Sequence, residues 1–115
     1  MINLKTIKGD NLNIAVQDVK IELFDGSFYE ITEADKLTFS LALGRDSPLI
    51  VRKYPGEIER VGETVIIKIS NSETEKLKCF SYDFDLKIDM KGKGENIYTI
   101  VNGQIEVLPT AGGGG

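Results

Sequence analysis

Three aspartates have the spacing that would place them on one face of a strand. Asp83, Asp85 and Asp89 alternate with apolar residues, so an extended backbone points all three carboxylates the same way. Carboxylates arranged in pairs can act as acid and base, or supply oxygen ligands to Ca²⁺. Lys87 interrupts this row on the same face, and antiparallel sheets normally carry a polar outer face. We therefore interpret the row as a solvent-exposed face rather than a site.

A glycine-containing segment next to the aspartates has the composition of a phosphate-binding loop. Lys91-Gly92-Lys93-Gly94 lacks the Gly-Lys-Ser/Thr ending of such loops. No helical pattern follows it that would direct a helix N-terminus at a phosphate. The segment is predicted to be a turn.

Cys79 is the only cysteine, and the chain contains no histidine. A thiol becomes a nucleophile when a neighbouring group lowers its pKa, and histidine is the most common such partner. The thiol is therefore predicted to be inert, and a lone cysteine excludes both an intrachain disulfide and a cysteine zinc site. Oxygen-only Ca²⁺ binding, with carboxylates from separate loops, is the one metal option left open. We assign no catalytic, cofactor-binding or metal-binding residue, expect no cofactor, and predict that the protein is not an enzyme.

The element that positions these residues is a strand over residues 80–90. Apolar and polar residues alternate without a break, which is typical of a strand with one buried and one wet face. We expect Asp83, Asp85 and Lys87 to be exposed. The residues expected on the inward face are Phe80, Tyr82, Phe84, Leu86, Ile88 and Met90.

Tyr82 follows a polar segment, residues 71–78, in which Leu77 is the only large apolar residue. This composition fits a corner where the chain crosses from one sheet to another, with Leu77 as the apolar side chain that fills the inside of the corner. The Tyr82 hydroxyl either anchors that corner through a backbone group, as in a tyrosine corner, or the ring simply packs in the core.

Further strands are predicted where the alternation recurs, at residues 37–43 and 64–70, and in shorter runs at 1–7, 12–16, 19–23, 49–53, 97–101 and 104–108. Asp25-Gly26 predicts a hairpin that is either very short or looser than two residues. Thr32 and Asp35 have the spacing of a helix-capping pair, but no helical apolar stripe follows, so we predict one turn at most. Asn102-Gly103 predicts either a second tight hairpin or a bulge.

These elements predict an all-β fold, an immunoglobulin-like antiparallel β-sandwich of about seven to nine short strands. Residues 1–109 are expected to form one domain and residues 110–115 a flexible glycine-rich tail. A formal net charge of −4 without a basic cluster argues against nucleic acid or an anionic membrane as partner. The sequence shows no pattern of a signal peptide or membrane span, so we expect the chain to be made and folded in the cytoplasm.

The order of the segments resembles the N-terminal domain of upper baseplate proteins from phages of Gram-positive bacteria. The resemblance covers residues 7–107 and consists of strand patterns and turn residues, without a catalytic motif. The segments that carry it are Ile7-Lys8-Gly9-Asp10-Asn11-Leu12, Leu23-Phe24-Asp25-Gly26, Ile31-Thr32, Leu37-Thr38-Phe39-Ser40-Leu41, Tyr82-Asp83-Phe84-Asp85-Leu86 and Tyr98-Thr99-Ile100-Val101-Asn102-Gly103-Gln104-Ile105-Glu106-Val107.

The resemblance implies an Ig-like structural protein of a phage or prophage virion, a baseplate or tail-tip assembly or adaptor module without enzymatic activity. The partners it implies are other phage tail or baseplate proteins, and we expect either a weak homo-oligomer or a monomer that binds such a protein. The contacts are expected at the edge candidates, residues 1–7 and 49–53, or at the loop of residues 44–48. The alternative is an Ig-like cell-surface or carbohydrate-binding module, although the chain has no tryptophan to form an aromatic sugar platform.

Overall fold

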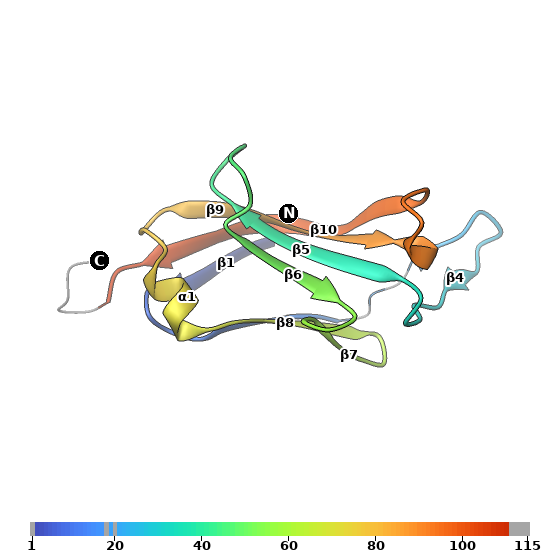
Figure 1. The fold of residues 1–115 in the computed structure, drawn as a ribbon, viewed down its shortest axis with the longest axis horizontal. Helices are drawn as coiled ribbons and strands as arrows, with labels where there is room; N and C mark the ends of the chain where they lie inside the picture. The colour runs from blue at the N-terminus through green and yellow to red at the C-terminus, as the bar shows by residue number, and fades with distance from the viewer. Residues whose placement is uncertain (1, 18, 20, 111–115) are drawn as a thin grey trace.

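A computed structural model describes residues 2–17, 19 and 21–110. A five-stranded sheet in the order β1-β10-β9-β5-β6 packs on a three-stranded sheet in the order β2-β8-β7, and the short hairpin β3-β4 lies at one end (Figure 1). The strands are β1 (Ile2–Ile7), β2 (Leu12–Val16), β3 (Ile21–Glu22), β4 (Phe28–Tyr29), β5 (Lys36–Ala42), β6 (Ile50–Tyr54), β7 (Glu59–Val61), β8 (Thr64–Ile69), β9 (Ser81–Asp89) and β10 (Ile97–Leu108); the helical turns are α1 (Asn71–Glu75) and η1 (Met90–Gly92). The prediction of an all-β sandwich is confirmed.

The inward row of β9 forms the middle of the core. Tyr82, Phe84, Leu86 and Ile88 are all buried, and the Phe84 ring lies 5.9 Å from the ring of Phe39 on β5. The prediction was wrong for Phe80, which is 47% exposed. The strand begins only at Ser81, because the Phe80 N–H turns back to the Lys78 carbonyl.

β10 is one continuous strand where the sequence predicted two. It pairs with β9 along its length, and the register shifts by one residue between Thr99 and Val101. A bulge therefore lies at Ile100, which explains why the apolar pattern changes from Tyr98 and Ile100 to the buried Ile105 and Val107. Of the two alternatives at Asn102-Gly103 the hairpin was wrong, and the bulge lies two residues earlier than expected.

β1 corrects the expectation of a purely antiparallel sandwich, because it runs parallel to β10. The two strands come from opposite ends of the chain, so no hairpin imposes an antiparallel direction on them. The described residues contain ten strands rather than seven to nine. The additional short strands are β4, the second strand of the hairpin predicted at Asp25-Gly26, and β7, which none of the predicted strands covers.

The corner at residues 71–78 contains the one-turn helix α1, which the sequence did not predict. Ser70 caps it through a capping box with Glu73. The buried Thr74 hydroxyl donates to the Asp10 carbonyl at 2.7 Å, which ties the corner to the turn between β1 and β2. Leu77 is buried as expected, and the Tyr82 hydroxyl donates to the Lys78 carbonyl at 2.9 Å. Between the two alternatives for Tyr82, the structure confirms the tyrosine corner.

Residues 111–115 of the predicted tail lie outside the described residues. Thr110, the first residue assigned to that tail, is described, and its hydroxyl donates to the Lys8 carbonyl at 3.1 Å.

Two phenylalanines on either side of the start of β9 provide a test of the core. Phe84→Ala should lower the free energy of unfolding by about 3–5 kcal/mol, because it leaves a cavity in the centre of the sandwich. Phe80→Ala should cost much less, since this ring is half exposed. Urea denaturation of both variants measures the difference, and equal losses would show that the boundary of β9 is wrong.

Candidate functional site

A single buried carboxylate, that of Asp35, joins three segments at one end of the sandwich. It accepts hydrogen bonds from the Tyr29 hydroxyl at 2.7 Å, from the Thr32 N–H at 2.8 Å and from the Lys91 N–H at 2.7 Å. Tyr29 belongs to β4, Thr32 to the turn before β5, and Lys91 to η1. Thr32 and Asp35 form the single turn predicted from their spacing, and the same carboxylate fixes the β3-β4 hairpin beside η1.

The hydrogen bonds at Asp35 change two pKa values in opposite directions. Burial opposes ionisation of Asp35, but the donors from Lys91, Thr32 and Tyr29 outweigh it and hold the pKa of this carboxyl below its usual value. The bond to Asp35, with burial, raises the pKa of Tyr29 to about 12. Near neutral pH the pair is therefore a carboxylate and a neutral phenol.

Large apolar side chains gather on the surface that this arrangement creates. Phe24, at the tip of the hairpin, is fully exposed, Tyr98 is 52% exposed and Leu23 is 38% exposed. Beside them lies an open hollow in which Ile21, Met90 and Ile100 are half buried. We call these six residues the hairpin-end surface: Ile21, Leu23, Phe24, Met90, Tyr98 and Ile100.

The hairpin-end surface draws on parts of the chain that are far apart in sequence. The loop between β3 and β4 supplies Leu23 and Phe24, and it projects beyond the two packed sheets in Figure 1. β3 supplies Ile21, and the first residues of β10 and the start of η1 supply the remaining part. The Met90 N–H donates to the Asn96 carbonyl at 3.0 Å, which closes the turn between β9 and β10. The surface therefore rests on a braced turn as well as on the hairpin.

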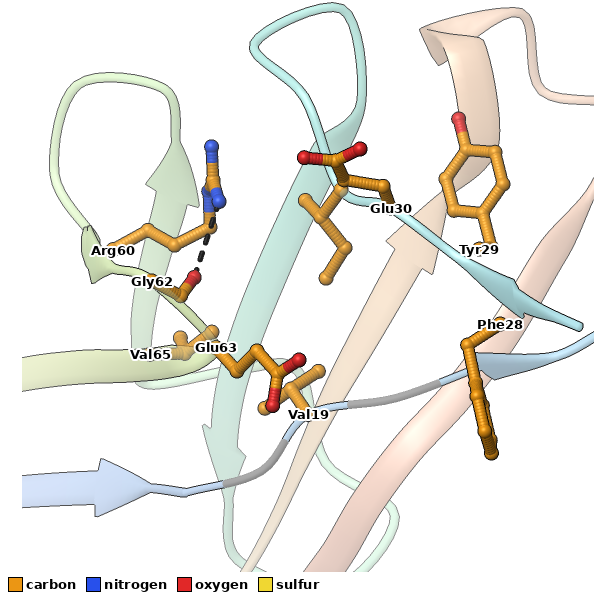
Figure 2. Close-up of a pocket in the computed structure, with 9 residues that line it drawn as sticks. Val19, Phe28, Tyr29, Glu30, Arg60, Gly62, Glu63 and Val65 are labelled. Carbon is orange, nitrogen blue, oxygen red and sulfur yellow. Dashed lines mark hydrogen bonds between the residues drawn. The ribbon is translucent and has the colours of Figure 1, made fainter.

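A second, more enclosed hollow of about 340 Å³ lies between the hairpin and the turn from β7 to β8. Figure 2 shows Arg60 on one side, Glu30 across from it, and the aliphatic Val19 and Val65 below. The Arg60 guanidinium donates to the Gly62 carbonyl at 3.2 Å and to the Tyr54 hydroxyl at 3.3 Å. It also lies 5.7 Å from the centre of the Tyr54 ring.

Two polar side chains of this second hollow, Tyr29 and Arg60, are held by bonds to the protein. The Tyr29 hydroxyl donates a hydrogen bond to Asp35, and the pKa of Tyr29 is about 12. Tyr29 is therefore not a base near neutral pH. Arg60 has its guanidinium bound to protein groups, and a guanidinium does not lose its proton in proteins. These bonds fasten the two sides of the hollow to the rest of the sandwich.

The aspartates singled out from the sequence lie along the outer face of β9, as predicted. Asp83 and Lys87 are exposed and Asp85 is partly exposed. Asp83 accepts a hydrogen bond from the Gln104 side chain at 3.2 Å. Asp89 accepts the Gly94 N–H at 3.0 Å. No group of three or more acidic, cysteine or histidine residues that could hold a metal ion occurs among the described residues.

The glycine-containing segment is a turn, as predicted. Its Lys91 N–H donates to Asp35 and its Gly94 N–H donates to Asp89, so two of the backbone donors that a phosphate loop would offer are bound to carboxylates. Cys79 is a half-buried free thiol in the corner before β9. Over the part of the chain that the structure describes, no helix is long and apolar enough to cross a membrane.

The sequence did not identify the hairpin-end surface. Leu23 was counted as the end of a strand over residues 19–23, and Tyr98 as part of a strand over residues 97–101. The available signal was the adjacent pair Leu23-Phe24 directly before Asp25-Gly26, because two neighbouring apolar residues cannot both face the core from one strand.

A scan of the sequence against models of known protein families gives no match, and a search of curated proteins finds no relative.

Removing the charge of Asp35 tests the junction that supports the surface. Asp35→Asn should lower the free energy of unfolding at pH 7 by about 2–4 kcal/mol, since buried donors lose an ionised acceptor. The pKa of Asp35 is lower in the folded than in the unfolded state, so its contribution is complete above about pH 4 and is lost as the pH falls through the folded value.

The difference between Asp35→Asn and the parent should therefore shrink between pH 7 and pH 3. Urea denaturation at both values measures it, with Asp83→Asn, which changes an exposed carboxylate, as the control. An Asp35→Asn variant as stable as the parent at pH 7 would contradict this role of the carboxylate.

The prediction that no metal is required has a direct test. The melting temperature should be the same with excess chelator and with millimolar Ca²⁺, since a cation that binds the folded state would raise it. A shift of many degrees would reveal a calcium site.

Proposed function

We propose that this chain is a non-enzymatic structural module that docks onto other proteins through its hairpin-end surface, as an assembly or adaptor domain of a phage tail tip or baseplate. The observation that carries the docking role is the full exposure of Phe24 beside an apolar hollow. Exposed apolar surface of this kind is typical of protein contacts, and aromatic side chains are enriched among the residues that dominate binding energy.

The setting in a virion rests on the resemblance to upper baseplate proteins. The segments that carry it include Leu23-Phe24-Asp25-Gly26 and residues 98–107, so they contain most of the hairpin-end surface. In this proposal the partners are other tail or baseplate proteins, assembly takes place in the bacterial cytoplasm, and the domain ends in the virion.

The exposed aromatic residues also favour one second candidate, a carbohydrate-binding module. Phe24 and Tyr98 would provide faces on which sugar rings stack. Protein docking is favoured because the rest of the hollow contains four aliphatic side chains, with Glu22, Asn96 and Thr99 as the polar groups. Binding to a glycan array that is lost in Tyr98→Ser would support the carbohydrate module instead.

Substitution of the exposed phenylalanine tests the docking surface. Phe24→Ser should weaken binding to the partner tail protein by about 2–4 kcal/mol, as expected for an aromatic side chain central to an interface. The loss is measured by pull-down and titration against the products of adjacent genes. The free energy of unfolding should not fall, because the Phe24 side chain is fully exposed.

Val61→Ser provides the matched control, since Val61 is also apolar and is 68% exposed, but lies on β7. This variant should bind like the parent. Equal binding by parent, Phe24→Ser and Val61→Ser would refute docking through the hairpin end. If the parent binds none of the neighbouring proteins, the adaptor role itself is wrong.

A further inference from the structure

One side of the sandwich is open. β1 is the edge of the five-stranded sheet and β2 is the edge of the three-stranded sheet, and a short turn connects them. A groove runs between the two edges. Its apolar lining consists of Ile2, Leu4, Leu12, Ile14, Val16 and the ring of Phe84.

The side chains of β1 show that this groove is an uncovered part of the core face. Ile2 and Leu4 are in register with Gly103 and Ile105 of β10, and Ile105 is buried in the core. Neighbours in register point to the same face, so Ile2 and Leu4 face inward. Ile2 is nevertheless 41% exposed and Leu4 is only half buried. The three-stranded sheet does not extend far enough to cover them.

The opposite edge, β6, is closed by hydrogen bonds from its surroundings. The Lys53 carbonyl accepts the N–H groups of Glu57 and Ile58, at 2.8 and 3.0 Å. The Val51 carbonyl accepts the Arg52 guanidinium at 3.2 Å. Arg52 also bonds to the Lys68 carbonyl and forms an ion pair with Glu73. A further strand would have to displace these contacts.

The edge of β1 has no such protection among the residues that the structure describes. Its contacts outside the sheet are at its C-terminal end, where the Asp10 N–H donates to the Ile7 carbonyl at 3.0 Å. Lys5 is the single charged residue of the strand, and it lies next to Glu106 in the sheet. Unpaired edges with so little charge are templates for pairing with another strand.

We infer that the occupant of this edge is a second copy of the chain, with the two β1 strands antiparallel across a two-fold axis. A two-fold contact requires a self-complementary segment, and β1 meets this requirement in one register. With Leu4 opposite Leu4 of the partner copy, Ile2 lies opposite Thr6 and Asn3 lies opposite Lys5, so that no like charges meet.

Other registers are less favourable. A shift by one residue would place the inward Leu4 of one copy opposite the outward Lys5 of the other. Inward side chains of one strand would then lie beside outward side chains of its partner. A register centred on Lys5 would place the two Lys5 side chains opposite each other. In the register centred on Leu4, the grooves of both copies face one another, and Leu12 and Val16 of each copy come to the contact. The apolar lining that is open in one chain is then covered in the pair.

This pairing uses a surface other than the hairpin end, so it holds or fails independently of the proposed docking function. The test changes Asn3, an exposed residue whose side chain lies on the outer face beside Gln104. Asn3→Lys would place like charges opposite each other twice in the pair, and Asn3→Glu would place opposite charges there.

Sedimentation velocity over a range of protein concentrations should show a reversible dimer of the parent chain. Asn3→Lys should raise the dimer dissociation constant by about tenfold, and Asn3→Glu should lower it. Both effects should weaken in high salt, because exposed charges are screened. Asn13→Lys adds the same charge to the exposed face of β2 and should change the constant less, which makes it the matched control.

Melting curves of all variants at low concentration should coincide, since Asn3 and Asn13 are both exposed. A parent chain that stays monomeric at several hundred micromolar overturns the inference. This holds even if the edge of β1 binds an extended peptide of another protein. Equal effects of Asn3→Lys, Asn3→Glu and Asn13→Lys would overturn the register, and with it the pairing through β1.

Discussion

The inward row of side chains on β9 is the constraint that the rest of the sandwich follows. β9 lies between β5 and β10 and is in register with both, so Leu41, Phe84 and Gly103 form one row across three strands. Phe84 also determines which residue can occupy the neighbouring position on β10. A Cβ atom at Gly103 would lie 2.8 Å from the Phe84 ring and 2.0 Å from the Ile2 carbonyl. Only glycine allows β1 to approach β10 this closely while the ring fills the space.

Polar junctions hold the two ends of this apolar core. Asp35 joins the hairpin, a turn and η1 at one end, and Glu73 at the other end accepts bonds from Ser70 and Arg52. For Glu73, as for Asp35, burial opposes ionisation but the donors outweigh it, so its pKa lies below the usual value. No buried side-chain nitrogen or oxygen in the described part of the chain lacks a partner. The exposed apolar residues at the hairpin end therefore rest on a support whose own polar groups are satisfied.

Much of the core could be predicted from the sequence, because alternation depends only on which face of a strand is wet. This is why the strands β5, β8 and β9 and the buried residues of β9 were identified correctly. Alternation contains no information on strand direction, so the parallel pairing of β1 was missed. It also continues past the end of a strand, as at Phe80, where a backbone hydrogen bond to Lys78 decides the boundary. α1 was missed because five residues are too few to show a helical stripe.

The candidate site was harder to predict than the core, for a related reason. The sequence does not show whether an apolar residue is buried or exposed. Only the tertiary arrangement leaves Leu23 partly exposed and buries Leu37. Asp35 could be placed in a turn by its spacing from Thr32. Its bond to the Lys91 N–H spans 56 residues, and no local pattern contains such a contact.

The difference between the two edges of the large sheet also limits how far copies of this chain can assemble. A sheet that is open at both edges can add neighbours without end and grow into a fibre. Here Arg52 and the turn after Lys53 close the far edge, so the proposed pairing through β1 stops at two copies. The same contacts that fasten β6 to the corner thus act as a terminator of polymerisation.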